Sequence, residues 1–154
     1  NSGFQSPARR HSRDRPVSYL LDTNVLSELV RKAPDPHVRQ WIAQRPAETL
    51  MVSALTLGEI RKGIERAPDV AHRQRLNDWF DEELSLWFSG RILPVDTQVA
   101  DRWGRLLASA GRPLPAIDSL LAATALHHDL VLVTRNTRDF EGLPLRVFSP
   151  WLTP

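Results

Sequence analysis

The chain has 154 residues, 42% of them apolar, which is enough for one domain with a sizeable hydrophobic core. It contains no cysteine, which excludes disulfides and thiolate chemistry and fits a reducing compartment. No apolar run approaches the roughly 20 residues of a transmembrane helix, and the N-terminus lacks the apolar core of a signal peptide. We therefore expect a soluble, cytoplasmic protein that does not associate with a membrane.

The positive charge is concentrated in the first 16 residues. The formal net charge is +2, but residues 1–16 carry four arginines and one aspartate, a net of +3. The remainder holds 16 basic and 17 acidic groups, a net of −1. Because this arm is polar and lacks periodicity, we expect residues 1–16 to be a disordered arm or a cloning remnant and residues 17–154 to form the folded domain.

From residue 19 onward, short strand patterns alternate with helical patterns. Strands are predicted at 19–21, 49–54, 91–95, 130–134 and 145–149. Helices are predicted directly after the first strand and at 37–45, 55–66, 70–88, 96–110 and 111–128, the last entered through two prolines. Residues 135–140 read as a polar loop. This alternation predicts an α/β fold with a parallel sheet and right-handed crossovers.

The helix predicted at 70–88 is the most clearly amphipathic. Its apolar stripe consists of Leu76, Trp79, Phe80, Leu84, Trp87 and Phe88. We expect these side chains to form core or a dimer surface rather than a ligand site. In the next helix, at 96–110, the residues predicted to face inward are Val99, Ala100, Trp103 and Leu107.

Polar residues follow the first two predicted strands, and each has a structural as well as a functional interpretation. Asp22, Thr23 and Asn24 come directly after the first strand, where Asp22 or Thr23 can simply cap the next helix. Glu59 lies one turn into the helix after the second strand, where a negative charge is favourable and Lys62 can pair with it. For Glu59 alone the structural interpretation is favoured.

Further polar residues occupy equivalent places later in the chain. Asp118 lies in the first turn of its helix, among the apolar neighbours Ile117 and Leu120, which predicts a partly dehydrated acid. Asn136 and Asp139 follow the strand at 130–134, where a helix or turn cap is the structural interpretation for both.

Taken together, these acids are expected to meet at one edge of the sheet, because the carboxyl ends of parallel strands emerge on the same side. Clustered carboxylates repel one another, and a bound cation removes that repulsion. Oxygen ligands without cysteine select a hard ion such as Mg²⁺ or Mn²⁺. The chemistry that fits such a site is metal-assisted phosphoryl transfer.

Four stretches support a family resemblance: "LLDTNVLSEL" (20–29), "LTLGEIRKG" (55–63), "PAIDSLLAATAL" (115–126) and "LVTRNTRDF" (132–140). In this order and spacing they resemble the PIN-domain ribonucleases and, more narrowly, the VapC toxins of bacterial toxin–antitoxin pairs, over roughly residues 18–150. The resemblance implies a three-layer α/β/α sandwich around a parallel sheet and a PIN-like nuclease domain at 17–154. It also implies a metal-dependent endoribonuclease toxin that cleaves RNA phosphodiester bonds.

The resemblance also implies roles for individual residues. The metal-binding acids are Asp22, Glu59 and Asp118, with Asn24 and Thr134 as supporting polar groups. Some members carry Asp at the position of Asn136, while here Asp139 supplies an acid three residues later. Asp139 is therefore counted among the catalytic acids and Asn136 among the supporting residues, and the fourth ligand and a second metal ion stay open.

The same resemblance implies partners. VapC proteins typically form homodimers, and a VapB-type antitoxin inhibits them with a C-terminal segment that wraps the toxin. The substrate is RNA, and phosphate contacts are expected from basic residues that flank the acids. These are Arg61, Lys62, Arg66, Arg135 and Arg138. For each of them, solvated surface is an equally good interpretation.

Two other interpretations compete with the nuclease. Haloacid-dehalogenase-like phosphatases also place an Asp after the first strand, but they need a second Asp two residues later, where this chain has Asn24. A catalytically degenerate PIN fold that only binds RNA or protein is suggested by Asn136 and opposed by the three retained acids. Metal-dependent RNA cleavage, with Asp22→Asn as a control, separates these possibilities.

Overall fold

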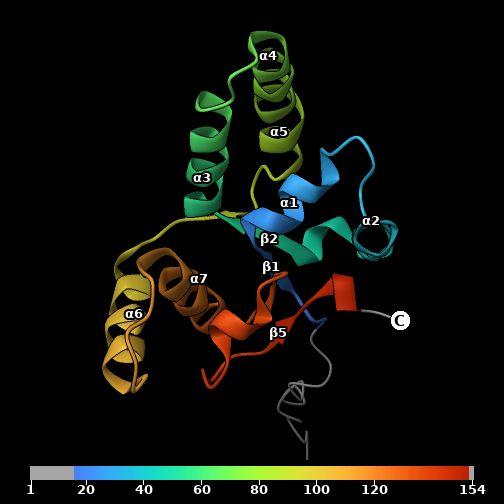
Figure 1. Cartoon of the computed structure of the whole chain (residues 1–154). Helices are drawn as coiled ribbons and strands as arrows, with labels where there is room; N and C mark the ends of the chain where they lie inside the picture. The colour runs from blue at the N-terminus through green and yellow to red at the C-terminus, as the bar shows by residue number, and fades with distance from the viewer. Residues whose placement is uncertain (1–15, 153–154) are drawn as a thin grey trace, which may run out of the picture.

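Five short strands form a parallel sheet in the computed structural model, which describes residues 16–152 (Figure 1). The strands are β1 (Tyr19–Leu21), β2 (Leu50–Ser53), β3 (Ile92–Leu93), β4 (Val131–Val133) and β5 (Val147–Phe148). Their order is β3-β2-β1-β4-β5, and every neighbouring pair is parallel. The central position of β1 places the residue after it, Asp22, in the middle of the carboxyl edge of the sheet.

Helices connect the strands. They are α1 (Thr23–Leu29), α2 (Pro36–Ala43), α3 (Ala54–Glu65), α4 (Val70–Asp78), α5 (Ser85–Trp87), α6 (Thr97–Ser109) and α7 (Ala116–His127). Four short helical segments are η1 (Ala47–Thr49), η2 (Trp79–Leu84), η3 (Thr137–Phe140) and η4 (Pro150–Leu152). Figure 1 shows α3 standing beside α4 and α5 at one end of the molecule, with α6 and α7 side by side at another.

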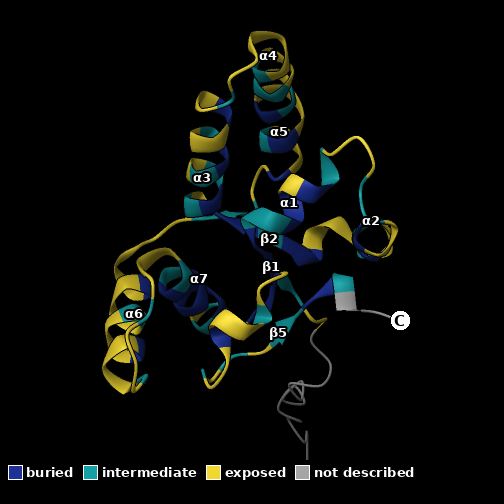
Figure 2. Ribbon diagram, viewed as in Figure 1, coloured by how far each residue is buried: buried dark blue, intermediate teal, exposed yellow. Residues whose placement is uncertain are grey.

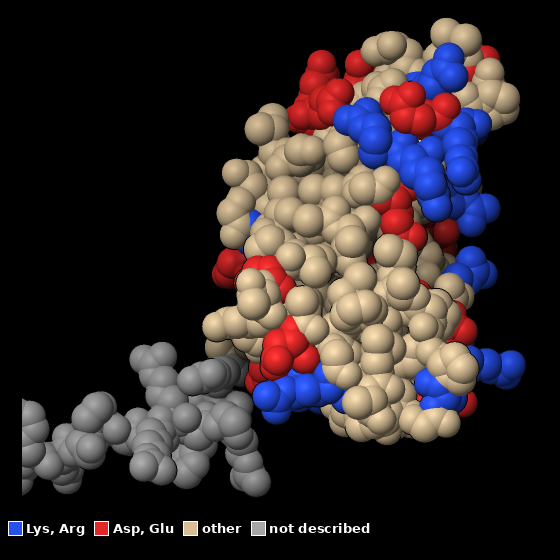
Figure 3. Space-filling model, turned by 90° about the vertical axis from the view of Figure 1, so that its left-hand side faces the viewer, with Lys and Arg blue, Asp and Glu red and all other residues tan. Residues whose placement is uncertain are grey.

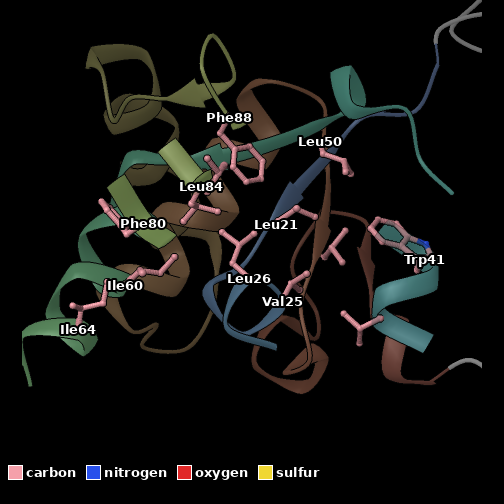
Figure 4. Close-up of a cluster of buried hydrophobic side chains, with 13 residues drawn as sticks. Leu21, Val25, Leu26, Trp41, Leu50, Ile60, Ile64, Phe80, Leu84 and Phe88 are labelled. Atoms are coloured by element: carbon pink, nitrogen blue, oxygen red, sulfur yellow. The ribbon is translucent and has the colours of Figure 1, made fainter. Parts of the chain in front are cut away.

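Alternation along the strands divides the core between the two faces of the sheet. Leu21 packs in a cluster with side chains of α1, α2, α3 and η2, drawn in Figure 4, whereas Leu20 packs in a second cluster with α6, α7 and η3. On β4, Val133 belongs to the first cluster and Leu132 to the second, as the two-residue period of a strand requires. Both faces are covered, which confirms the predicted α/β/α sandwich. Figure 2 shows the same division, with buried residues concentrated around the sheet and on α7.

The helix predicted at 70–88 is interrupted by a π-helical turn, η2, between α4 and α5. A π turn holds more residues than an α turn, so it rotates the residues after it relative to the expected stripe. Phe80, Leu84 and Phe88, at steps of four, are buried, whereas Trp87 is 45% exposed. Trp87 is therefore not part of the core, and a dimer surface stays the prediction for it.

A second correction concerns α6. Leu106 is buried, and Leu107, which was predicted to face inward, is 37% exposed. The helix buries residues at steps of four and three, starting from Val99 and passing through the half-buried Trp103. The predicted Ala100 is exposed for the same reason.

Two sequence predictions concern the ends of the chain and the membrane. Residues 1–15 lie outside the described part, so the predicted disorder of the arm is not tested. Within residues 16–152 no helix is both long and apolar enough to cross a bilayer.

Candidate active site

Asp22 is fixed at the carboxyl end of β1 by three hydrogen bonds. Its main-chain nitrogen donates to the carbonyl of Val133 on β4 (2.9 Å). The Oδ1 atom accepts from the nitrogen of Thr23 (2.7 Å), and Oδ2 accepts from the hydroxyl of Thr134 (2.8 Å). The first side-chain bond is a helix-capping contact, as the structural interpretation predicted. The second joins β1 to β4 and leaves Asp22 8% exposed.

Thr134 is a buried junction between three segments that carry polar residues. Its hydroxyl donates to Asp22 and accepts from Asn24 Nδ2 (3.3 Å) and from the nitrogen of Asn136 (3.1 Å). Asn24 in turn accepts from the nitrogen of Arg135 through Oδ1 (3.2 Å). Asn24 therefore orients Thr134 and the loop after β4, and it acts on Asp22 through Thr134.

Glu59 reaches the same edge from α3. Its Oε1 atom accepts a hydrogen bond from the hydroxyl of Thr23 (3.0 Å), which links it to the start of α1. The ion pair with Lys62 that the spacing allows is not formed within residues 16–152. Thr23, which the sequence suggested only as a cap, thus connects two acids through its main-chain and side-chain donors.

Asp118 lies at this edge because α7 runs back toward the start of β4, so its first turn meets the strand ends. Burial raises the pKa of the Asp118 carboxyl above its usual value, and the charges of Asp22, Asp139 and Glu59 raise it further. Burial also raises the pKa of Asp22, with a smaller contribution from Asp139, while its bonds from Thr134 and Thr23 act in the opposite direction. These mutual effects place the four acids within electrostatic reach of one another.

The site has the composition that a hard cation requires. The side-chain groups that could ligate a metal ion here are carboxylates, hydroxyls and amides. None of the four acids forms an ion pair in the described part of the chain. Among residues 16–152, however, no three acidic or histidine side chains stand close enough together to enclose an ion. Magnesium commonly takes only one or two protein carboxylates and keeps several waters, so the residues fit such an ion in that form.

The basic residues predicted to bind RNA differ in their surroundings. Arg61 is engaged within the protein, since it bonds to Asn77 (2.5 Å) and to Asp81 (2.8 Å) and stacks on Phe80. Lys62 and Arg66 are exposed on α3. Figure 3 shows Lys and Arg side chains gathered at the end of the molecule that α3 and α4 form.

The two remaining predicted contacts lie near Asp139. Arg135 and Arg138 are exposed in the segment after β4, and the guanidinium of Arg135 lies 5.3 Å from the ring centre of Trp151. Asn136 precedes η3 but makes no side-chain capping bond, so the cap interpretation is wrong for its side chain.

Sequence reasoning missed further residues that hold the site. Trp103 Nε1 on α6 donates to the hydroxyl of Ser119 (2.8 Å), the residue after Asp118. Arg112 donates to the main chain on both sides of Phe140, in the segment that carries Asp139. These contacts join positions 16 to 29 residues apart, and no local sequence pattern signals them.

Comparison with known proteins identifies the class. The PIN domain family model matches residues 19–144, and the chain therefore belongs to the PIN-domain family. The VapC ribonuclease Y4jK of Sinorhizobium fredii is 36% identical over 86% of this chain and 96% of its own length. The toxin FitB of Neisseria gonorrhoeae is 35% identical over 86% of this chain and 97% of its own. The crystal structure of FitAcB from Neisseria gonorrhoeae superposes with a TM-score of 0.82 at 33% identity, covering 88% and 99% of the two chains.

Proposed function

We propose that this protein is a metal-dependent endoribonuclease and the toxin of a toxin–antitoxin pair. The observation that carries the proposal is the group of four acids without basic partners at the carboxyl edge of a PIN-fold sheet. The names of the two relatives, a VapC ribonuclease and a toxin, support the activity and the role. The substrate is RNA, and the inhibitor is a VapB-type antitoxin.

The cofactor we propose is Mg²⁺ or Mn²⁺, held by Asp22, Glu59 and Asp118 together with water. When bound, it polarises the phosphate and stabilises the charge on the leaving oxygen. The acids Asp22 and Glu59 are each oriented by a hydroxyl, from Thr134 and Thr23 respectively, which fixes where their free lone pairs point.

Asp118 differs from Asp22 and Glu59 in its contacts. Its carboxylate makes no hydrogen bond within the described residues, so its oxygens are open to a cation or to the attacking water. Its raised pKa shows that burial and the neighbouring acids disfavour the ionised carboxylate in the metal-free site, a penalty that a bound cation would remove. Asp139 adds negative charge that acts on Asp22 and Asp118. Four exposed basic residues can contact RNA phosphates outside the acids, namely Lys62, Arg66, Arg135 and Arg138.

The decisive experiment is RNA cleavage by the purified protein with Mg²⁺ or Mn²⁺, with and without EDTA. We expect cleavage that requires the metal and that Asp22→Asn reduces by at least about 100-fold. The matched control is Asp101→Asn, because Asp101 is an exposed acid on α6 paired with Arg105. Cleavage that survives both EDTA and Asp22→Asn would disprove the proposal. RNA binding without cleavage would instead indicate the degenerate, binding-only PIN fold.

A further inference from the structure

A single arginine joins two segments that carry acids of the proposed site. Arg112 lies in the connection between α6 and α7, six residues before Asp118. One of its terminal nitrogens, Nη2, donates to the main-chain carbonyl of Asp139 (3.1 Å) and to that of Glu141 (3.1 Å). The guanidinium therefore connects the start of α7 with η3 and the residue directly after η3.

The backbone around Arg112 is constrained on both sides. Gly111 has φ of +68°, a left-handed conformation that glycine adopts without strain. Pro113 comes next and restricts Arg112 to extended backbone conformations. These neighbours limit the directions in which the arginine side chain can leave the chain.

The segment that Arg112 contacts is short, and Arg112 joins it to a distant part of the chain. η3 is a single 3₁₀ turn of four residues, in which the carbonyls of Arg138 and Phe140 accept from the main-chain nitrogens of Glu141 and Leu143, whereas the carbonyl of Asp139 accepts from Arg112. Phe140 anchors the segment in the core at 3% exposure, and Arg112 binds the carbonyls on either side of it. The core contact fixes the depth of the segment, and the two hydrogen bonds fix the rotation of the backbone that carries the exposed Asp139.

We propose that Arg112 is a positioning residue, which holds the Asp139 carboxylate at a set place relative to Asp118 and so fixes the negative charge that Asp139 adds beside the metal-binding acids. The inference rests on the proposed function. Arg112 makes no ion pair with any of the four acids within residues 16–152, so it acts on Asp139 through the main chain. The charge of Asp139 already affects both Asp22 and Asp118, so a change in its position alters the whole group.

The test measures Mn²⁺ affinity by calorimetry on the protein without RNA, alongside the cleavage rate. Arg112→Ala should weaken Mn²⁺ binding roughly 10-fold, as losses of groups that orient metal ligands typically do. Arg112→Lys, which keeps the charge and donors for the carbonyls, should recover part of the loss. The control is Arg146→Ala, which removes an exposed arginine that lies just before β5 and pairs with Asp129. It should change neither the Mn²⁺ affinity nor the cleavage rate.

A double-mutant cycle shows whether Arg112 acts through Asp139. In the Asp139→Asn background, Arg112→Ala should cause no further loss of Mn²⁺ affinity, because the acid that it positions is already gone. A second 10-fold loss in the double variant, or wild-type Mn²⁺ affinity in Arg112→Ala, would overturn the inference, as would a wild-type protein that binds no Mn²⁺. If the wild type binds Mn²⁺ with this dependence on Arg112 but cuts no RNA, the proposed function fails and the inference stands.

Discussion

Asn24 shows how a neutral side chain can serve an acidic site without contacting its acids. The amide uses its donor for the Thr134 hydroxyl and its acceptor for the main chain of Arg135. Both the nitrogen and the oxygen of the Asn24 amide are therefore used, and an aspartate at this position would lack the N–H donor. The bridge ties the start of α1 to the loop after β4, at a position where Asn is by itself a weak helix former.

We predict that Asn24→Ala folds but loses roughly 10–100-fold in metal affinity or cleavage rate, since Thr134 then loses one of the bonds that orient it toward Asp22. Asn24→Asp should do no better, because it adds a negative charge to repelling acids. Thermal midpoints without metal and cleavage rates with Mg²⁺ check both variants. If Asn24→Ala cleaves RNA at the rate of the wild type, Asn24 has no role in the site, and the Asp22–Asn24 segment is only a helix start with one functional acid.

Asp118→Asn should separate activity from stability. The pKa of Asp118 is higher in the folded protein than its ordinary value, so the ionised group opposes folding at any pH above the raised pKa. Removing the charge should abolish cleavage yet leave the metal-free protein as stable or up to about 1 kcal/mol more stable at pH 7.

The pH dependence of the stability difference between Asp118→Asn and the wild type serves as a control. As the pH falls through the raised pKa toward that of the unfolded chain, wild-type Asp118 becomes protonated and its penalty disappears. The stability difference between Asp118→Asn and wild type should therefore vanish below about pH 4. Urea denaturation at several pH values measures it, and a severely unfolded Asp118→Asn would instead support a structural role for the acid.

At the scale of elements, hydrophobic periodicity predicted the order of strands and helices, because that order depends on local sequence pattern. The order of strands and helices follows from alternation such as Leu20 and Leu21 on opposite faces. The π turn at Trp79–Leu84 was not predictable, because the apolar positions of this stretch also fit a regular α-helix and no residue type marks the wider turn. Leu106 rather than Leu107 is buried because of the way α6 packs against α7, and the sequence of α6 alone does not reveal that packing.

The candidate site also has a part that the sequence predicted, its acids, and a part that it did not, the hydrogen bonds that orient them. The acids could be proposed because parallel strands bring their carboxyl ends to one edge. The bonds that orient them, from Thr23 to Glu59 and from Thr134 to Asp22, join residues 36 and 112 positions apart. Such contacts depend on the packed tertiary structure, so their partners cannot be read from spacing.

Glu28 provides a test of how α1 is joined to α2. This buried acid accepts from the nitrogen of Asp35 (2.9 Å) and from Arg31 (3.1 Å), and these contacts hold the connection between the two helices. The hydrogen bond from the Asp35 main chain is the main reason that the pKa of Glu28 lies below its usual value, and Arg31 contributes.

We predict that Glu28→Gln lowers the free energy of unfolding at pH 7 by about 1 kcal/mol, because a charge-assisted bond becomes a neutral one. The stabilisation by Glu28 is fully present above the unfolded pKa of about 4.5 and is lost as the pH falls through the lowered folded pKa. Urea denaturation at pH 7 and below pH 4 should thus show the difference closing. A difference that persists in acid would mean that shape rather than charge explains it.

At the scale of the whole molecule, charge is distributed unevenly between the arm and the domain. Residues 1–16 have a net charge of +3, while the remainder has −1 and concentrates four acids at one edge of the sheet. An RNA nuclease with such a domain depends on local basic groups, and Lys62, Arg66, Arg135 and Arg138 are exposed around the acids. The arm can add affinity for RNA only through electrostatics that salt screens.

We predict that removal of residues 1–15 leaves folding and cleavage at physiological salt unchanged. The fold begins no later than Ser18, whose carbonyl accepts from the nitrogen of Val131 (3.0 Å), so this truncation leaves every described residue and the first contact of β1 with β4 in place. The thermal midpoint should match that of the full chain, whereas RNA affinity at low salt should fall modestly, because a net charge of +3 is lost. Cleavage rates at two salt concentrations check this, with Arg146→Ala in the full chain as a control for loss of a positive charge far from the acids. If the truncated protein loses cleavage at physiological salt, the arm takes part in binding or positioning the substrate, and the assignment of the activity to the folded domain alone is wrong.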